Sequence, residues 1–165
     1  MNNPVSAIAS AVIMGLGGTL AFDLWGLLLQ RVFGIAPSNI CLVGRWLRGM
    51  LAGRFRHASI AAAPQQPGEC TVGWIAHYSI GVMFACVFVA LAGSGWLANP
   101  KPVPAIAFGT VTVLAPFVLM QPAMGLGVAA AKTANPAQAR LRSLLNHIAF
   151  GAGLYLFGLV AGGLV

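Results

Sequence analysis

Four long runs of apolar residues divide the sequence, and they constrain its fold more than any other feature. The runs cover residues 5–33, 72–97, 103–121 and 144–165, with a continuation of the third run to residue 131 left open. A helix needs about 20 residues to cross the hydrocarbon core of a bilayer, and each run is close to that length or longer. The runs lack the alternation of barrel strands, so they predict helices. We expect an all-α membrane protein with four transmembrane helices in a bundle, forming a single integral membrane domain over residues 1–165.

The composition agrees with a chain that is solvated mostly by lipid. Hydrophobic residues make up 59% of the sequence, charged residues make up 7%, and the mean hydropathy is +0.87. A soluble domain uses about 25% charged residues to cover its surface. Nine Lys and Arg against two acids give a net charge of +7. These basic residues are few and confined to loops, so we expect the bilayer, and no nucleic acid, as the partner.

The basic residues lie in two of the three connections between the runs. The first connection, residues 34–70, and the third, residues 132–142, hold eight of the nine Lys and Arg when Arg31 is included. The second connection holds only Lys101. By the positive-inside rule both basic connections face the cytoplasm, so both chain ends are expected on the non-cytoplasmic side. No basic residue precedes the first run, which is therefore expected to be a retained span and not a cleaved signal.

Within the first connection, residues 38–51 have the pattern of a short amphipathic helix. Ser38 is suited to cap it, and Arg45 and Arg48 share a face beside Trp46 and several aliphatic residues. Such a helix suits the interface of an anionic leaflet, and packing of the helix against the bundle is the alternative. The candidates for contacts with anionic lipid head groups are Arg45, Arg48, Arg54, Arg56 and His57.

Small residues recur at four-residue spacing in the first, second and fourth runs, which predicts close contacts between helices. Each of these faces also carries a polar side chain, namely Asp23, His77 and His147. The third run is interrupted by two prolines, and Gln121 lies at the second break. We expect these four polar residues to converge in the cytoplasmic half of the bundle.

Several interpretations of this polar cluster stay open. We favour a protein that handles a solute or protons, because histidine titrates near neutral pH, and we assign no catalytic residue and lean against an enzyme. His77, His147 and Asp23 also form a ligand set suited to a divalent metal, and the two histidines are suited to haem. Alternatively, the cluster only holds the helices together by hydrogen bonds. The chain is then an accessory or assembly subunit of a larger membrane complex. A thin bundle of four spans also favours a homodimer.

The cysteines give no sign of a covalent framework. Cys41, Cys70 and Cys86 are odd in number, and no C-x-x-C pair occurs. We therefore expect ordinary thiols, without a disulfide or a zinc site.

An ordered set of short motifs runs along most of the chain. The motifs are Gly44-Arg45-Trp46, Gly53-Arg54-Phe55-Arg56-His57, Gly73-Trp74 with His77-Tyr78, Met120-Gln121-Pro122, Arg142-Ser143-Leu144 with His147, and Phe150-Gly151. With this set the sequence resembles a family of small bacterial membrane proteins catalogued as domain of unknown function 2938. The resemblance implies a multi-pass protein of the bacterial inner membrane. It implies no activity, cofactor or catalytic residue.

Overall fold

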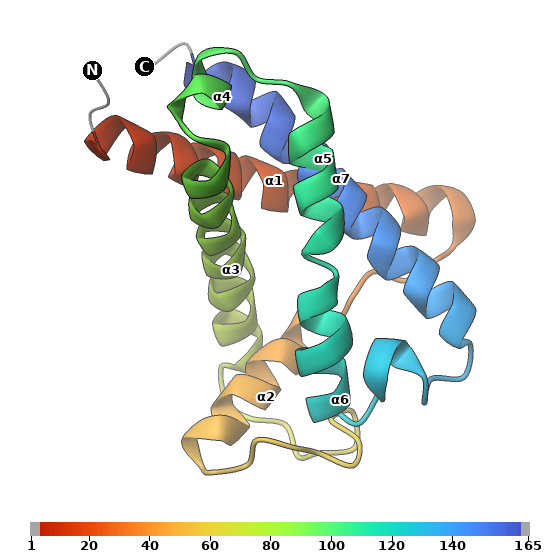
Figure 1. Cartoon of the computed structure of the whole chain (residues 1–165). Coiled ribbons are helices and arrows are strands. Elements are labelled where there is room, and N and C mark those ends of the chain that lie inside the picture. The colour runs from red at the N-terminus through yellow and green to blue at the C-terminus, as the bar shows by residue number, and fades with distance from the viewer. Residues whose placement is uncertain (1–3, 163–165) are drawn as a thin grey trace. The chain divides into compact units, whose positions relative to one another are not determined.

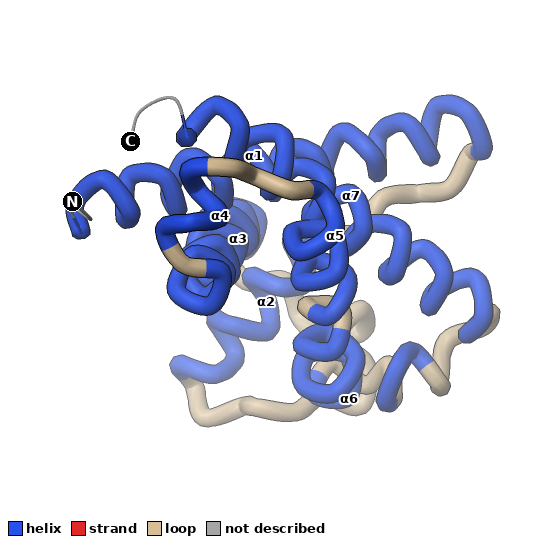
Figure 2. The backbone as a smooth tube through the Cα atoms, turned by 45° about the horizontal axis from the view of Figure 1, so that its top comes forward, coloured by secondary structure: helices blue, strands red, loops and turns tan. Residues whose placement is uncertain are grey.

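The computed structural model describes residues 4–162, and all the regular structure within them is helical (Figure 2). The elements, labelled in part in Figure 1, are α1 (Pro4–Phe33), α2 (Ile40–Leu51), α3 (Glu69–Ala92), α4 (Ser94–Ala98), α5 (Pro102–Val111), the π-helical turn η1 (Pro116–Met120), α6 (Gln121–Ala123), the 3-10 turn η2 (Val128–Ala130) and α7 (Pro136–Gly162). Four stretches of the described chain are long and apolar enough to span a membrane: Val5–Phe33, Glu69–Ala92, Pro102–Ala123 and Pro136–Gly162. The prediction of four spans with a short helix after the first is confirmed.

The second and fourth spans differ from their predicted bounds. Gly93 ends α3 with a φ of 75°, and α4 follows, so the helix predicted over residues 72–97 is broken by a left-handed glycine. Helix α7 begins at Pro136, eight residues before the predicted start at residue 144. Proline suits the first turn of a helix, and Asn135 Oδ1 accepts a bond of 3.1 Å from the amide of Gln138. Residues 163–165 of the predicted run lie outside the described residues.

The third span is irregular, as its prolines predict. Helix α5 ends at Val111, Pro116 opens the π-helical turn, and Pro122 lies in α6. Proline lacks the amide hydrogen that an α-helix needs four residues after each carbonyl. The wider π turn is closed by a bond from the Gln121 amide to the Pro116 carbonyl. Gly125 follows with a φ of 87°, so the helix ends at Ala123 and does not continue to residue 131.

By their contacts the described residues divide into two compact units, which we name by their content. The core unit falls within Met1–Pro37, Tyr78–Thr112 and Leu145–Val165, and it contains the buried apolar cluster. The basic unit comprises Ser38–His77 and Val113–Leu144. Seven of the nine Lys and Arg belong to the basic unit, namely Arg45, Arg48, Arg54, Arg56, Lys132, Arg140 and Arg142.

Glycines bring the helices of the core unit into backbone contact. A Cβ added to Gly15 on α1 would collide with the backbone of Val82 on α3. One added to Gly109 on α5 would collide with the backbone of Gly151 on α7, and one on Gly153 would collide with α1. These contacts confirm that the small residues mark helix interfaces, where van der Waals packing is the main attraction in lipid.

Aromatic and aliphatic side chains fill the space that these close contacts leave. Met14 and Leu154 are fully buried, and Phe88 packs edge-on against Trp96 with ring centroids 4.7 Å apart. The large side chains on the outside of the spans are apolar too, and Leu91 is 75% exposed. An apolar outer surface of this extent is the surface that lipid covers.

In the basic unit, α2 lies against the first turns of α3. A Cβ on Gly44 would collide with the carbonyl oxygen of Glu69, so the two helix backbones touch. A disulfide joins Cys41 of α2 to Cys70 of α3, with a Cα–Cα distance of 4.0 Å. The prediction of ordinary thiols is wrong for this pair, because the pairing depends on contact between two helices and leaves no local spacing signal. Cys86, which lies in α3, is a free and exposed thiol.

The N-terminal cap of α2 also differs from the prediction. Asn39, not Ser38, has the extended backbone of a cap residue, and its Oδ1 accepts a bond of 3.1 Å from the Cys41 amide. Asparagine is among the best residues at this position because its side chain satisfies an otherwise unbonded amide. Helix α2 therefore begins at Ile40, two residues later than predicted.

Candidate functional site

Asp23 is the one acidic residue in the interior of a span, and it lies on α1 in the core unit. Its Oδ2 accepts a hydrogen bond of 3.0 Å from the hydroxyl of Tyr78 on α3. Both side chains are half-buried. A carboxylate in hydrocarbon needs such a donor, because its charged form is otherwise expensive. The bond therefore joins the first and second spans at a residue that can hold a negative charge.

His147 makes the corresponding contact between the third and fourth spans. Its Nδ1 lies 2.8 Å from Oγ1 of Thr112, and that hydroxyl donates its single hydrogen to the carbonyl oxygen of Gly109. We therefore assign a hydrogen to His147 Nδ1, which donates to Thr112. The imidazole also packs edge-on against Phe22, the neighbour of Asp23, with ring centroids 5.7 Å apart.

Each of the four spans thus contributes one residue to these bonds within the core unit. We call Asp23, Tyr78, Thr112 and His147 the polar layer. The sequence predicted Asp23 and His147 and missed their two partners. A signal for Tyr78 was present, since the hydroxyl of a tyrosine in an apolar span needs a bonding partner. Thr112 lies between the end of α5 and the π-helical turn that begins at Pro116. Because the helix is irregular there, the direction of the Thr112 side chain does not follow from helical spacing.

His77 and Gln121, the other two predicted members of the cluster, belong to the basic unit. The His77 ring lies edge-on to Trp74 with a centroid distance of 5.8 Å. Gln121 is 8% exposed, and its Oε1 is buried without a hydrogen-bond partner among the described residues. Within residues 4–162 no group of three His, Cys, Asp or Glu side chains is placed to hold a metal ion. Metal or haem binding by His77, His147 and Asp23 stays a prediction.

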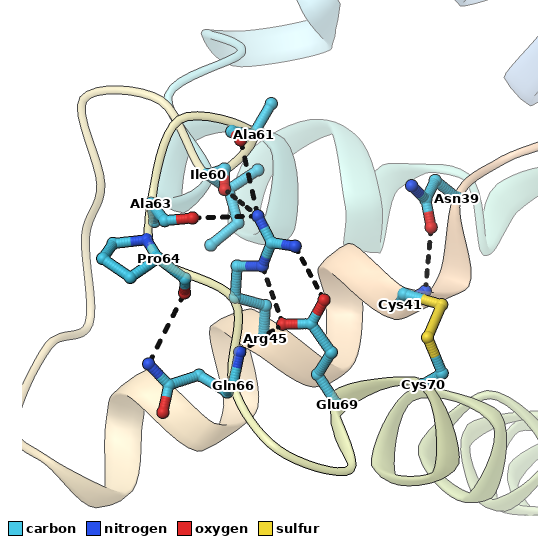
Figure 3. Close-up of polar contacts among 10 residues, drawn as sticks. All are labelled: Asn39, Cys41, Arg45, Ile60, Ala61, Ala63, Pro64, Gln66, Glu69 and Cys70. Atoms are coloured by element: carbon cyan, nitrogen blue, oxygen red, sulfur yellow. Dashed lines mark hydrogen bonds and ion pairs between the residues drawn. A yellow bond between two sulfur atoms is a disulfide. The ribbon is translucent and has the colours of Figure 1, made fainter.

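Arg45 bonds several groups of the basic unit at once (Figure 3). Its Nε and Nη2 donate to the two carboxylate oxygens of Glu69 at 2.8 and 2.7 Å. Its Nη1 donates to the carbonyl oxygens of Ile60, Ala61 and Ala63 at 3.2, 3.4 and 3.0 Å. The side chains of Arg45 and Glu69 are only 8% and 10% exposed.

The bidentate pair has a clear electrostatic consequence. The hydrogen bond with Glu69 raises the pKa of Arg45 above its usual value, so this guanidinium stays charged at any physiological pH. Arg45 was predicted to contact lipid head groups. Its donors bond the loop of residues 60–63 and the start of α3, because a buried guanidinium needs a carboxylate and carbonyls around it.

The long loop of the basic unit is also tied to the end of the third span. The His57 amide donates to the Ala123 carbonyl at 2.8 Å, and the Ile60 amide donates to the Met124 carbonyl at 3.0 Å. A Cβ on Gly125 would collide with the backbone of residues 57 and 58, so the two segments lie in direct contact. These bonds fix His57 at a defined place. Four of the five predicted head-group residues line one cavity there, whereas Arg56 does not; the four are Arg45, Arg48, Arg54 and His57.

Comparisons with curated proteins and with solved structures gave no match. A family model described as "Protein of unknown function (DUF2938)" matches residues 12–161. The match covers all four residues of the polar layer and the whole basic unit. The chain, with its four candidate membrane spans, therefore belongs to the family described as Protein of unknown function (DUF2938).

Proposed function

We propose that this polytopic membrane protein passes protons, alone or together with a small solute, through its polar layer. The observation that carries the proposal is the bond between Asp23 and Tyr78 in a layer to which every span contributes a polar residue. Ionisable residues inside spans are rare and costly, and where they occur they mark ion and proton pathways more often than plain packing contacts.

The chemistry of the layer suits proton uptake and release. When Asp23 is charged it accepts from the Tyr78 hydroxyl, and when it is protonated the same hydroxyl can turn and accept from it. His147 keeps its Nδ1–H bond to Thr112 whether or not its Nε2 carries a proton, so the imidazole changes charge without losing that contact. Each ionisable group therefore has a partner that tolerates both of its protonation states.

Two further groups near the layer have unsatisfied hydrogen-bonding capacity. Asn146, beside His147 on α7, is 2% exposed, and its Oδ1 has no hydrogen-bond partner among the described residues. Nε1 of Trp25, two residues after Asp23 on α1, is also buried without a partner in the described chain. Buried polar atoms are nearly always bonded to protein or water, so an acceptor and a donor of this kind favour a passing water or solute over a dry structural lock.

The test is proton flux through the purified protein in lipid vesicles that enclose a pH-sensitive dye. A potassium gradient with valinomycin drives the flux. The wild type is expected to acidify the vesicles faster than empty vesicles do, and Asp23→Asn is expected to reduce the rate at least tenfold. Asparagine has the size of aspartate and still accepts from Tyr78, so the variant removes only the charge. Ser79→Ala, next to Tyr78 on an exposed face, is the matched control. Equal rates for wild type and Asp23→Asn would overturn the proposal.

We also propose that the loop of residues 34–70 faces the cytoplasm of a bacterial cell and that both chain ends face away from it. Eight of the nine basic residues support this orientation. The Cys41–Cys70 disulfide weighs the other way, because disulfides persist in oxidising compartments and are reduced in the cytoplasm. In the proposed orientation the pair is a dithiol in the living cell.

Labelling of intact cells with a membrane-impermeant maleimide decides between the two orientations. The background is a chain in which Cys41, Cys70 and Cys86 are replaced by serine. Gln65→Cys, in the exposed part of the basic loop, is expected to react only after lysis. Asn99→Cys, in the exposed turn before α5, is expected to react in intact cells. The reverse pattern would place the basic loop outside.

A further inference from the structure

A cavity in the basic unit has no part in the polar layer. Its volume is about 200 Å³, and its polar lining consists of Arg45, Arg48, Arg54, His57 and Gln66. Helix α2 supplies the first two of these residues, and the loop that follows supplies the others. The cavity therefore collects basic side chains from two segments whose relative position is fixed by Arg45 and by the bonds of the loop.

The positive charge around this cavity is not balanced by the protein. The chain has two acids, of which Asp23 belongs to the core unit and Glu69 is bound bidentately by Arg45. Arg48 and Arg54 consequently have no further carboxylate in the basic unit to pair with. Guanidinium groups that converge on a cavity without a counter-charge create a strong local attraction for anions.

Two buried nitrogen atoms of the cavity residues also have no hydrogen-bond partner in the described chain. They are Nε of Arg48 and Nε2 of His57. The backbone of His57 is anchored to Ala123, and Gly49 lets the imidazole approach α2, since a Cβ there would lie 3.1 Å from Nε2. Buried nitrogens of this kind are costly unless a bonding partner arrives. The backbone of His57 is thus held in place, and two nitrogens of the cavity lining have unused bonding capacity.

The end of α2 does not cancel this attraction. A helix C-terminus repels anions because its last carbonyl oxygens point outward. Here the Gly49 carbonyl accepts from the amides of Ala52 and Arg54, and the Met50 carbonyl accepts from the amide of Gly53. These bonds occupy two of the terminal carbonyls, which weakens the repulsion and leaves the full charges of Arg48 and Arg54 as the stronger influence in the cavity.

We propose that this cavity binds a phosphate group, carried either by an anionic lipid head group or by a free phosphate in solution. The planar guanidinium presents its donors in a fork that matches two phosphate oxygens, which makes arginine the preferred residue for such groups. Arg48 and Arg54 bind the phosphate, and His57 donates from Nε2 in its cationic form or in its Nε2–H neutral form. Arg45 is a positioning residue, since its Nη1 bonds the carbonyls of Ile60 and of Ala63, and Ala63 belongs to the cavity lining.

Two probes applied to the full-length protein in detergent micelles separate the two sources. The first is dioleoyl phosphatidylglycerol, titrated in mixed micelles and compared with dioleoyl phosphatidylcholine by native mass spectrometry. The second is inorganic phosphate, titrated by calorimetry. Saturable binding of one equivalent of either probe supports the proposal. Preference for phosphatidylglycerol without phosphate binding assigns the site to a lipid head group, and phosphate binding without a lipid preference assigns it to a solute.

Matched variants decide whether the cavity itself is responsible. Arg48→Gln and Arg54→Gln are each expected to weaken binding of the active probe at least tenfold. Arg56→Gln removes the same charge from the same loop outside the cavity lining, and it is expected to change binding less than twofold. Retention of the disulfide and of the helical circular dichroism shows that each variant is folded. Failure of both probes to bind the wild type, or an equal loss in Arg56→Gln, would overturn the proposal. Proton flux is measured separately, so either proposal can fail alone.

Discussion

The two units of this protein hold their helices together by different means. In the core unit the helices touch at glycines such as Gly15 and Gly109, and hydrogen bonds of the polar layer join side chains of different helices. In the basic unit a disulfide, a bidentate ion pair and backbone bonds between loop and span do the same task. The difference follows from composition. Apolar spans have little besides close packing with which to attract one another in lipid, whereas the basic unit is rich in polar groups that need partners.

This comparison predicts that added side-chain bulk destabilises the core unit most. It also predicts that loss of a cross-link or of a polar bond destabilises the basic unit most. The substitution with the largest expected effect is therefore Gly109→Leu. The added side chain would have to enter the backbone of Gly151, which cannot move aside as a flexible side chain can. We expect a loss of roughly 4 kcal/mol or more in the free energy of unfolding, measured by denaturant titration in mixed micelles. Gly95→Leu is the control, because nothing lies within 4 Å of a Cβ at that residue. Similar losses for the two variants would mean that glycine packing is not what holds the core unit.

Removal of the disulfide tests the other half of the comparison. Closing a loop between residues 41 and 70 restricts the unfolded chain, and bonds of this kind typically stabilise a fold by about 2–4 kcal/mol. We expect Cys41→Ser combined with Cys70→Ser to lower the free energy of unfolding by that amount in oxidising buffer and to have little effect in dithiothreitol. Cys86→Ser changes an exposed free thiol and is expected to stay within about 0.5 kcal/mol of the wild type. A double variant as stable as the wild type without reductant would show that the cross-link adds nothing.

The smallest expected effect concerns the N-terminal cap of α2, where a single hydrogen bond of the basic unit is removed. Asn39→Ala removes the acceptor for the Cys41 amide and is expected to cost about 1 kcal/mol. Ser38→Ala, one residue earlier, is expected to cost less than about 0.5 kcal/mol, since Asn39 and not Ser38 has the cap geometry. Thermal unfolding followed by circular dichroism compares the stability of the two variants. A larger loss in Ser38→Ala than in Asn39→Ala would show that Ser38 is the cap, as the sequence suggested.

The spans and the small-residue contacts were predictable from sequence because both depend on patterns within one helix. The partners of Asp23 and His147 were not. Neighbouring residues on a helix point about 100° apart, so whether His77 or Tyr78 faces α1 depends on a rotation that the pattern of small residues does not fix to one residue.

The pairings of the basic unit were beyond sequence reasoning for a different reason. The Arg45–Glu69 and Cys41–Cys70 pairs each join residues more than twenty positions apart, across a loop without regular structure. Such contacts follow from tertiary structure and leave no periodic signal. The Asn135-Pro136 pair shows a third kind of difficulty, since the same two residues suit a turn and the first turn of a helix.

The position of Arg45 in the chain has a consequence for biosynthesis. All its bonding partners lie between residues 60 and 69, so they leave the ribosome shortly after Arg45 and before most of the second span. This closure needs only nearby sequence and is expected to form early, whereas the bonds from the loop to Ala123 and Met124 must await the third span. A ribosome-bound chain that has exposed α3 but not the third span would therefore already hold the bonds of Arg45, while the cavity of the basic unit still lacked the anchor of His57.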